Sequence, residues 1–336
     1  MREKLRFHAP AFWFQAPGWT SRLLQPLAAV VAQIARRRRN RKGWRAPVPV
    51  LCVGNLTVGG TGKTTAVLDL VQRLQKRGVA AHCLTRGYGG QATKSGEALR
   101  VDLEQHTARD VGDEALLLAS VAPCWVCADR AVSARIAVAH GAECLVMDDG
   151  FQNPGLHKDM SLVLVDGAVG FGNGCVLPAG PLREDLVSGL AAADAVVITG
   201  EDRVGVATDL RARQLPVLTA ALHMEKMPPS QKEKRVIAFA GLARPEKFFE
   251  GLRANGVQPV RCIPFPDHHM FTEKDLAHLT ALAHENDAHL VTTPKDAVKL
   301  PATFRRTVAV IGVTLQWQEP AMINGLLDRL MKERAV

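Results

Sequence analysis

The segment Val48–Thr65 joins a short apolar run to a glycine-rich turn that ends in Lys63-Thr64-Thr65. Backbone N–H groups freed by glycines, with the positive end of a following helix, form a phosphate cradle. In such loops the lysine reaches the β- and γ-phosphates and the next hydroxyl holds Mg²⁺. We predict nucleotide contacts along the whole loop, with Lys63 also catalytic and Thr64 also a metal ligand: Thr57, Val58, Gly59, Gly60, Thr61, Gly62, Lys63, Thr64 and Thr65.

The loop departs from the strict pattern at one position. A glycine is expected five residues before Gly62, and the chain has Thr57 there. Gly59 and Gly60 leave the turn flexible, so we interpret the loop as a variant of the phosphate-binding pattern. The alternative, an ordinary strand-to-helix turn, leaves Lys63-Thr64-Thr65 unexplained.

A second candidate segment, residues 143–152, is an apolar run that ends in two acids before a glycine. A phosphate loop needs a carboxylate at the end of a neighbouring strand to organise Mg²⁺. We assign Asp148 to the metal, and Asp149 points the other way along the pleat if the strand continues. A helix N-cap or a turn acid would explain one of these residues but not the pair.

Phosphoryl transfer also needs a group that orients the acceptor hydroxyl or takes its proton. Asp113 and His268 are candidates, although a helix N-cap and an ordinary loop histidine remain open as alternatives. Arg183 and Glu184 follow a Pro/Gly turn and could bind phosphate and support Mg²⁺, and helix capping explains them equally well. The Lys295-Asp296 pair lacks the spacing of a guanine-reading motif, so it indicates no GTP.

The elements that must position these residues alternate between continuous apolar runs and helical patterns. This alternation predicts an α/β fold, a parallel sheet with helices on both faces. With the glycine-rich loop after its first strand, the expected fold is P-loop NTPase-like. The expected strands are 48–54, 80–85, 124–128, 143–148, 161–166 and 195–199, and the expected helices are 63–77, 112–121, 130–140 and 182–193.

A looser region from Gly200 to Lys234, with Pro216 and Pro228-Pro229, marks a predicted boundary between lobes. We expect a nucleotide-binding lobe at 46–215 and a smaller α/β lobe at 216–336 that contributes acceptor-side residues. The strands expected beyond the boundary are 235–240, 258–263, 289–292 and 307–314, and the helices are 244–255, 272–286 and 319–333.

The excess of positive charge lies at the N-terminus. Residues 1–45 carry eleven Lys/Arg against Glu3, and the rest of the chain holds 31 basic and 32 acidic residues. A nearly neutral fold argues against a nucleic-acid groove, so we expect no nucleic-acid partner.

The order of residues within 1–45 favours a membrane surface. Aromatic residues come first, then the apolar segment Leu23–Ala35, then the polybasic run 36–45. The apolar part is too short to span a bilayer, and a signal peptide would have the reverse order. We predict an interfacial helix and a polybasic flank on an anionic membrane. The alternative is a buried amphipathic helix followed by a charge run in solvent or on RNA.

Seven scattered cysteines suit reduced thiols in a cytosolic compartment. Cys124 and Cys127 form a C-x-x-C pair, but no second pair stands at zinc-finger spacing. We interpret them as part of a buried strand.

Together these segments resemble the tetraacyldisaccharide 4'-kinases of lipid A biosynthesis. The resemblance rests on GNLTVGGTGKTT at the phosphate loop, TRGYGG at 85–90, VGDEA at 111–115, MDDGFQN at 147–153, LPAGPLRE at 177–184, FPDHHMF at 265–271 and TTPKDAVK at 292–299. One departure is Ala115, where the family pattern has proline.

The resemblance implies an ATP- and Mg²⁺-dependent kinase acting on the 4'-hydroxyl of an acylated glucosamine disaccharide 1-phosphate to give lipid IVA. It implies a two-lobed P-loop fold and a monotopic N-terminal helix at the cytoplasmic face of the bacterial inner membrane. By motif, Asp113 and His268 form the pair that activates the sugar hydroxyl. Asp148 and Asp149 take the metal and phosphate roles.

An alternative function is a switch ATPase of the partition or septum-positioning type, which has a similar phosphate loop. Those loops carry a lysine before the first glycine of the pair, where this chain has Val58. Their membrane anchor is usually C-terminal, whereas the predicted one here is N-terminal.

Overall fold

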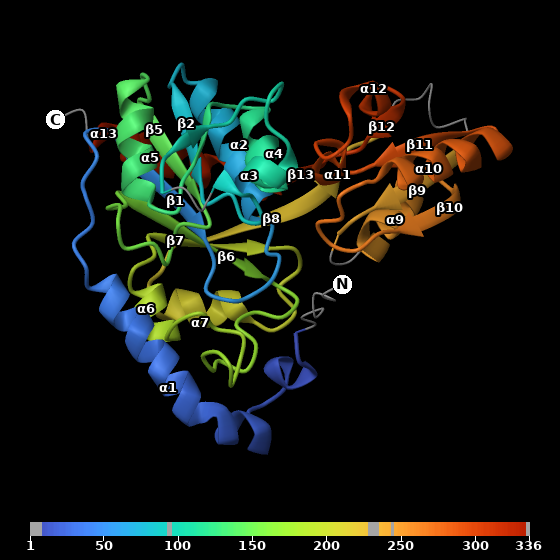
Figure 1. The fold of residues 1–336 in the computed structure, drawn as a ribbon. Helices are drawn as coiled ribbons and strands as arrows, with labels where there is room; N and C mark the ends of the chain where they lie inside the picture. The colour runs from blue at the N-terminus through green and yellow to red at the C-terminus, as the bar shows by residue number, and fades with distance from the viewer. Residues whose placement is uncertain (1–8, 93–95, 228–234, 243–244, 334–336) are drawn as a thin grey trace. The chain divides into compact units, whose positions relative to one another are not determined.

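The computed structural model describes residues 9–92, 96–227, 235–242 and 245–333 of the 336-residue chain (Figure 1). The chain forms two compact units. The first comprises Met1–Thr85, Asp129–Ala221 and Gln316–Val336, and the second comprises Arg86–Ala128 and Leu222–Leu315. Each unit is therefore discontinuous in sequence, whereas the predicted lobes were consecutive segments.

The first unit is built on a largely parallel sheet with the strand order β13-β8-β7-β6-β1-β5-β2. Every residue of β1, β2, β5 and β7 is buried, as expected for continuous apolar strands covered on both faces. The strands are β1 (Val50–Gly54), β2 (Ala81–Thr85), β5 (Cys144–Asp148), β6 (Met160–Asp166), β7 (Ala195–Thr199), β8 (Val217–Met224) and β13 (Val313–Trp317).

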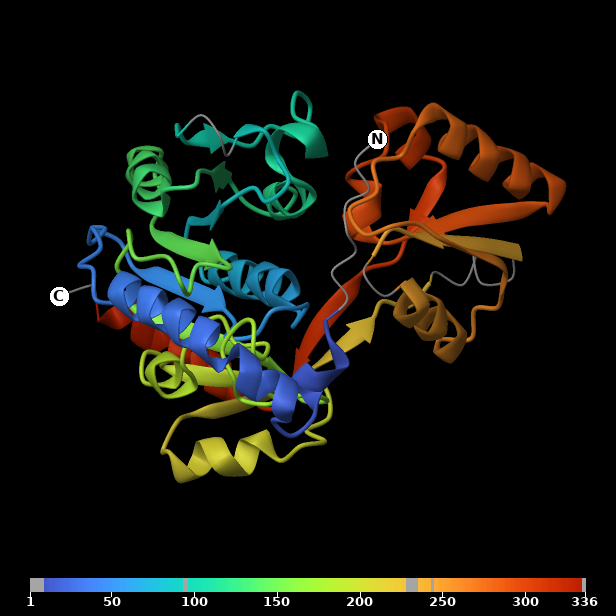
Figure 2. The ribbon, with the colours of Figure 1, turned by 60° about the horizontal axis from the view of Figure 1, so that its bottom comes forward.

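The helices of the first unit include α2, which packs on β1, β2 and β5 through an apolar face at helical spacing. Figures 1 and 2 both show α1 lying along this unit next to α6. The helices are α1 (Trp19–Arg39), α2 (Lys63–Gln75), α5 (Arg130–Ala139), α6 (Leu186–Leu190), α7 (Val206–Ala212) and α13 (Pro320–Lys332), preceded by the 3-10 turn η1 (Ala11–Phe14).

The second unit holds a four-stranded parallel sheet in the order β10-β9-β11-β12, and a segment from the first half of the chain. The sheet part consists of β9 (Arg235–Ala240), α9 (Pro245–Ala254), β10 (Pro259–Pro264), α10 (Glu273–Glu285), β11 (Ala288–Thr292), α11 (Pro294–Ala297), α12 (Ala302–Arg305) and β12 (Val308–Val310). The other segment contains β3 (Leu99–Arg100), α3 (Ala108–Val111), α4 (Asp113–Ala119) and β4 (Cys124–Val126).

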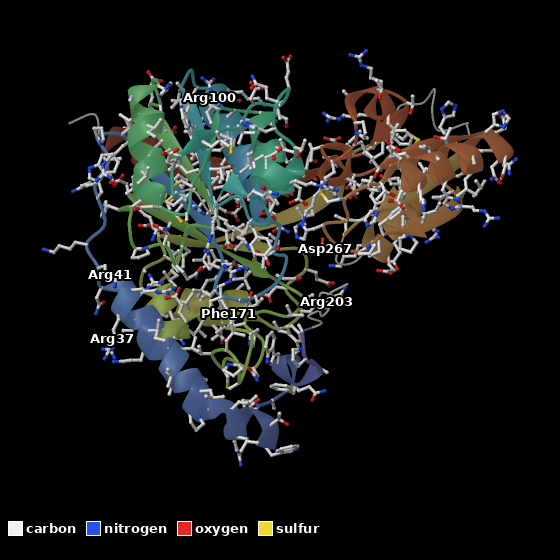
Figure 3. The ribbon with its side chains drawn as sticks, viewed as in Figure 1. Arg37, Arg41, Arg100, Phe171, Arg203 and Asp267 are labelled. Carbon is white, nitrogen blue, oxygen red and sulfur yellow. The ribbon has the colours of Figure 1, made fainter. Side chains whose placement is uncertain are left out.

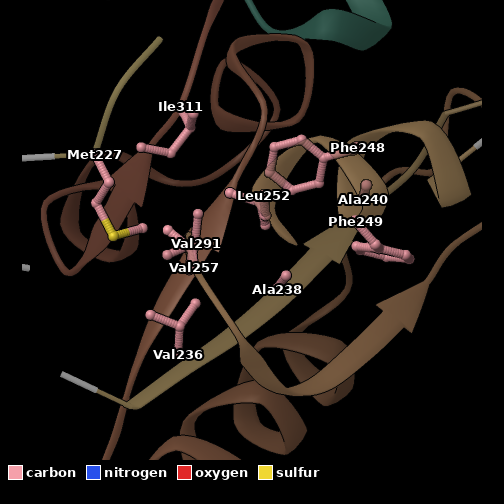
Figure 4. Packing of buried hydrophobic residues seen from close by; sticks show 10 residues of the cluster. All are labelled: Met227, Val236, Ala238, Ala240, Phe248, Phe249, Leu252, Val257, Val291 and Ile311. Atoms are coloured by element: carbon pink, nitrogen blue, oxygen red, sulfur yellow. The ribbon is translucent and has the colours of Figure 1, made fainter. Parts of the chain in front are cut away.

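The central strand β9 has a core on each face because its side chains alternate. Val236, Ala238 and Ala240 belong to one cluster, which Figure 4 shows with Phe248, Phe249 and Leu252 of α9 among its members. Ile237 and Phe239 belong to the other cluster, beside Leu279 of α10. The two clusters fix this sheet between α9 and α10.

Most predicted strands and helices are present within a few residues of their expected bounds. The helix expected at 182–193 is reduced to α6, because the residues before it form bends and pair with the segment before the glycine-rich loop: Arg183 N–H donates to Leu56 O at 2.7 Å. The strand expected at 307–314 is instead β12 and β13, which are separated around Gly312. Sequence patterns missed α7 and β8, which lie in the region interpreted as a boundary.

Some sequence features lie outside the described residues: Arg2, Glu3, Lys4, Arg6 and the Pro228-Pro229 pair. All seven cysteines lie within the described residues and are thiols, with Cys124 and Cys127 buried as expected for a strand.

Candidate active site

The glycine-rich loop connects β1 to α2 in the first unit. Gly62 precedes α2 in the left-handed conformation, with φ 79°, and Gly59 has φ 127°. These values favour glycine, so the residues that the pattern requires also fit the backbone. Thr57, the departure from the strict pattern, is buried and pairs with Leu182 in an isolated antiparallel bridge.

Thr64, in the first turn of α2, lies next to Asp148 at the carboxyl end of β5. Asp148 is paired in register with Val53 of β1, and Thr64 Oγ1 donates to Asp148 Oδ2 at 3.2 Å. A hydroxyl and a carboxylate are hard oxygen donors, and Mg²⁺ in nucleotide sites takes one or two carboxylates along with phosphates and waters. The described residues contain no group of three or more His, Cys, Asp or Glu that could hold a metal alone. The two oxygen donors of Thr64 and Asp148 fit a metal that also binds nucleotide phosphates.

The strand does not continue through Asp149, so this residue does not have the orientation expected from the pleat of a continuing strand. β5 ends at Asp148, and Asp149 has φ 49°, a left-handed turn that is uncommon for a residue with a side chain. Its carboxylate lies 3.8 Å from Lys63 Nζ and 2.8 Å from Arg183 Nη1. The turn thus gathers one acid and two cations beside the glycine-rich loop.

Backbone pairing brings Arg183 and Glu184 to the same place. Val58 N–H donates to Pro181 O at 2.9 Å, so the 181–183 segment runs beside the glycine-rich loop. The buried Glu184 carboxylate accepts from Arg39 of α1 and, at 3.0 Å, from Gln152 Nε2. Its carboxylate is therefore engaged by protein groups, and its role as a metal ligand stays a prediction.

A cavity of about 350 Å³ lies between α1 and the segment that follows Asp149. Lys158 lines it and donates to Phe151 O at 3.0 Å and Asn153 O at 2.7 Å. Burial lowers the pKa of Lys158. The lining combines apolar side chains of α1 with basic groups: Val31, Ile34, Arg38, Arg41, His157, Lys158 and Arg183.

The second unit contains the other predicted pair, Asp113 and His268. Gly112 precedes α4 with φ 86°, and a Cβ there would lie 2.6 Å from Tyr88 O, so this tight backbone contact requires glycine. Asp113 is the first residue of α4, so Ala115 does not displace the start of the helix. His268, like Asp149, has a left-handed backbone, with φ 56°.

His268 Nδ1 donates to Asp113 Oδ2 at 2.9 Å. The histidine side chain is 40% exposed and the aspartate side chain only 4%, so the ring is the part of the pair that a ligand can reach. Burial alone would raise the pKa of Asp113, but the hydrogen bond from His268 and the positive charge of Lys295 hold it below the ordinary value. The structure therefore keeps an ionised carboxylate behind an accessible imidazole.

Three neighbours of this pair were not assigned from the sequence. Lys295 Nζ lies 3.8 Å from Asp113, Asp267 lies 3.8 Å from His268 Nε2, and the Tyr88 ring centroid lies 6.1 Å from that of His268. The motifs TRGYGG, FPDHHMF and TTPKDAVK contain these residues, but a motif alone does not show which of its side chains meet.

Known proteins similar to this chain belong to one family. A family model described as tetraacyldisaccharide-1-P 4'-kinase matches residues 20–331. The chain belongs to the tetraacyldisaccharide 4'-kinase family. It is 55% identical over 322 residues to the tetraacyldisaccharide 4'-kinase of Gluconacetobacter diazotrophicus, covering 96% of this chain and 97% of that one. The kinase of Gluconobacter oxydans is 51% identical over 324 residues, with 96% and 97% covered.

A solved structure of the family is also similar. The "apo" form of LpxK from Aquifex aeolicus in complex with ATP has a TM-score of 0.73 and 27% identity, over 93% of this chain and 99% of that one. The predicted resemblance, the P-loop α/β fold and the kinase class are confirmed. No finding supports the alternative of a switch ATPase. Among the helices of the described residues, none combines the length and apolar character needed to cross a membrane.

Proposed function

We propose that this kinase transfers the γ-phosphoryl group of ATP to the 4'-hydroxyl of tetraacyldisaccharide 1-phosphate, giving lipid IVA. The observation that carries the proposal is the 2.9 Å hydrogen bond between Asp113 and the accessible imidazole of His268. A switch ATPase has no need of a base for an alcohol, whereas a sugar kinase does. The family assignment supports the choice of acceptor.

The first unit supplies the donor half of the reaction. Thr57–Thr65 would cradle the phosphates of ATP, and Thr64 with Asp148 would hold Mg²⁺, which would neutralise charge that develops on the phosphate oxygens. Lys63 neutralises the transferred group, while Asp149 keeps Lys63 and Arg183 in place through ion pairs at 3.8 Å and 2.8 Å. Arg183 also suits phosphate oxygens because its guanidinium is a fixed fork of donors.

The second unit supplies the acceptor half. With Nδ1–H donated to Asp113, the neutral ring of His268 has Nε2 as its acceptor. Nε2 takes the proton of the 4'-hydroxyl as the oxygen attacks, and the ionised Asp113 stabilises the imidazolium that results. Asp113 itself is too buried to meet the sugar, so His268 is the base and Asp113 orients it.

The acceptor also carries a phosphate at position 1, and the cavity beside α1 suits it. Basic side chains on both walls, including Arg38, Arg41 and Lys158, favour an anion there. The apolar residues Val31 and Ile34 on the same side match the start of acyl chains. We therefore place the anomeric phosphate and adjoining chains against α1.

The same helix suits an anionic membrane surface. Its exposed large apolar residues recur every three or four positions and form one face: Trp19, Leu23, Leu27, Val30 and Ile34. Arg36 to Arg39 form the last turn, and Figure 3 shows Arg37 projecting outward from it. An apolar face with a basic end is typical of a monotopic helix. We propose the cytoplasmic face of the bacterial inner membrane as its place.

The test is a transfer assay with purified protein, Mg²⁺, ATP labelled in the γ-phosphate and acylated disaccharide 1-phosphate. We expect a labelled lipid with one extra phosphate at the 4'-position. ATP hydrolysis without a lipid product, together with dimerisation on ATP, would overturn the proposal in favour of a switch ATPase.

A further inference from the structure

In the second unit, Lys295 lies beside the two acids that flank the imidazole of His268. Its Nζ lies 3.8 Å from Asp113 Oδ2 and 3.8 Å from Asp267 Oδ1. The two carboxylates lie on the two nitrogens of the ring, with Asp113 2.9 Å from Nδ1 and Asp267 3.8 Å from Nε2. One ammonium thus bridges the two acids between which the histidine lies.

The backbone that carries Lys295 is held by buried polar groups. α11 begins after Thr293, whose hydroxyl donates to Asp296 Oδ2 at 2.8 Å. Asp296 also accepts from Gly241 N–H at 3.0 Å and pairs with Lys299 Nζ at 2.7 Å, with both side chains of the ion pair fully buried. Buried groups held by hydrogen bonds and an ion pair resist rearrangement, so the backbone at Lys295 is held in place.

The loop that carries His268 is held on its other side by aromatic packing. His269 stacks on Phe265 with centroids 4.8 Å apart and contacts Asp275 Oδ2 at 3.0 Å. His268 itself has a left-handed backbone, a conformation that costs free energy and needs support from its surroundings. The Lys295–Asp267 contact provides such support directly beside the strained residue.

We propose that Lys295 is a positioning residue of the acid–base pair. Its ammonium offsets the repulsion between Asp113 and Asp267, and holds both acids so that the ring keeps Nδ1 on Asp113 and presents Nε2 to the acceptor hydroxyl. Lys295 acts through His268 and not on a phosphate of either substrate. This inference rests on the proposed role of the Asp113–His268 pair.

The proposal requires that Lys295 matters only while His268 is present. The experiment compares Lys295→Met, Lys295→Arg and Lys274→Met in full-length protein, and repeats Lys295→Met in a His268→Ala background. Lys274 is an exposed lysine of α10 and controls for the loss of one surface charge. Thermal unfolding of each variant shows whether it is folded before its kcat and KM values are compared.

We expect Lys295→Met to lower kcat roughly ten- to a hundredfold with little change in either KM, since small misplacements of reacting groups have costs of this size. Lys295→Arg should recover most of the loss, and Lys274→Met should match the wild type. In the His268→Ala background, Lys295→Met should change kcat by less than about twofold, because residues that act as a unit are not additive.

Other results would overturn the inference. A raised KM for ATP or for the lipid at normal kcat would make Lys295 a substrate-binding residue. An equal loss in both backgrounds would show that it does not act through His268. Different results would overturn the proposed function: a wild-type protein that makes no lipid product, or a His268→Ala variant with full activity.

Discussion

The two groups of candidate catalytic residues, one in each unit, are built in contrasting ways. The donor half, in the first unit, is a continuous loop with a carboxylate from an adjacent strand, so Thr64 meets Asp148 through the register of β1 and β5. The acceptor half, in the second unit, is assembled from three separate segments that bring in Asp113, His268 and Lys295. The donor half depends on backbone geometry, and the acceptor half depends on side-chain charge.

This difference explains which substitutions should impair each half. A phosphate cradle uses N–H groups and a helix end that most substitutions leave in place, so only its charged side chains carry a large effect. The acid–base pair has one reactive ring, and its function depends on a buried partner and on neighbouring charges. Substitutions in the two halves should therefore separate nucleotide binding from the chemical step.

The largest effect is expected from Lys63→Ala, which removes the ammonium beside the transferred phosphate. Loss of one charged group that stabilises the transition state costs on the order of a thousandfold in kcat. Transfer of labelled phosphate to the lipid, measured with ATP titrated to saturation, gives kcat and KM. An unchanged kcat would show that Lys63 does not stabilise the transferred phosphate.

His268→Ala should come next, with kcat lower by on the order of a hundredfold or more, the usual contribution of a general base. KM for ATP should stay near the wild-type value, because the base belongs to the acceptor half. His278→Ala, which removes an exposed histidine of α10, is the matched control and should be fully active. Full activity of His268→Ala would end its assignment as the base.

A smaller change is expected when the apolar face of α1 is altered. Leu23→Ser with Leu27→Ser removes two exposed leucines that would lie among lipid chains. Burying one leucine side chain fully stabilises the membrane-bound state by about 1.5 to 3 kcal/mol. Flotation with vesicles of anionic lipid should show at least a tenfold weaker association.

The control for this change is Leu103→Ser, an exposed leucine of the second unit that should not alter flotation. Equal flotation of the double variant and the wild type would exclude α1 as the membrane contact.

The smallest effect concerns stability in acid. The folded pKa of Asp113 lies below its unfolded value, so its ionised form stabilises the fold above the unfolded pKa. That stabilisation is lost as the pH falls through the two pKa values. Urea unfolding at pH 7 and near pH 3 should therefore show the free-energy gap between wild type and Asp113→Asn narrowing in acid. A gap independent of pH would contradict an ionised Asp113.

The sequence predicted the donor half more completely than the acceptor half. Glycines and apolar runs determine the loop and the strand beside it, so Lys63, Thr64 and Asp148 could be placed from local pattern alone. The left-handed turn at Asp149 and the pairing of Thr57 with Leu182 depend on tertiary contacts that no local pattern encodes. Those contacts place Arg183 beside Asp149.

The acceptor half shows more clearly what local sequence patterns do not predict. Asp113 and His268 are 155 positions apart in the chain, and their meeting depends on how residues 86–128 join the C-terminal sheet in one unit. That arrangement is also why the predicted boundary between lobes differs from the observed units. The sequence assigns no role to Lys295 beyond excluding a guanine-reading motif, because its neighbours Asp113 and Asp267 are far from it in the chain.

The separation of the two halves can be tested on one set of samples. Binding of Mg·ATP, measured by calorimetry, should be tight in the wild type and in His268→Ala, and clearly weaker in Lys63→Ala. Transfer to the lipid should be strongly reduced in both variants. If His268→Ala weakened nucleotide binding as much as Lys63→Ala does, the division into a donor half and an acceptor half would be wrong.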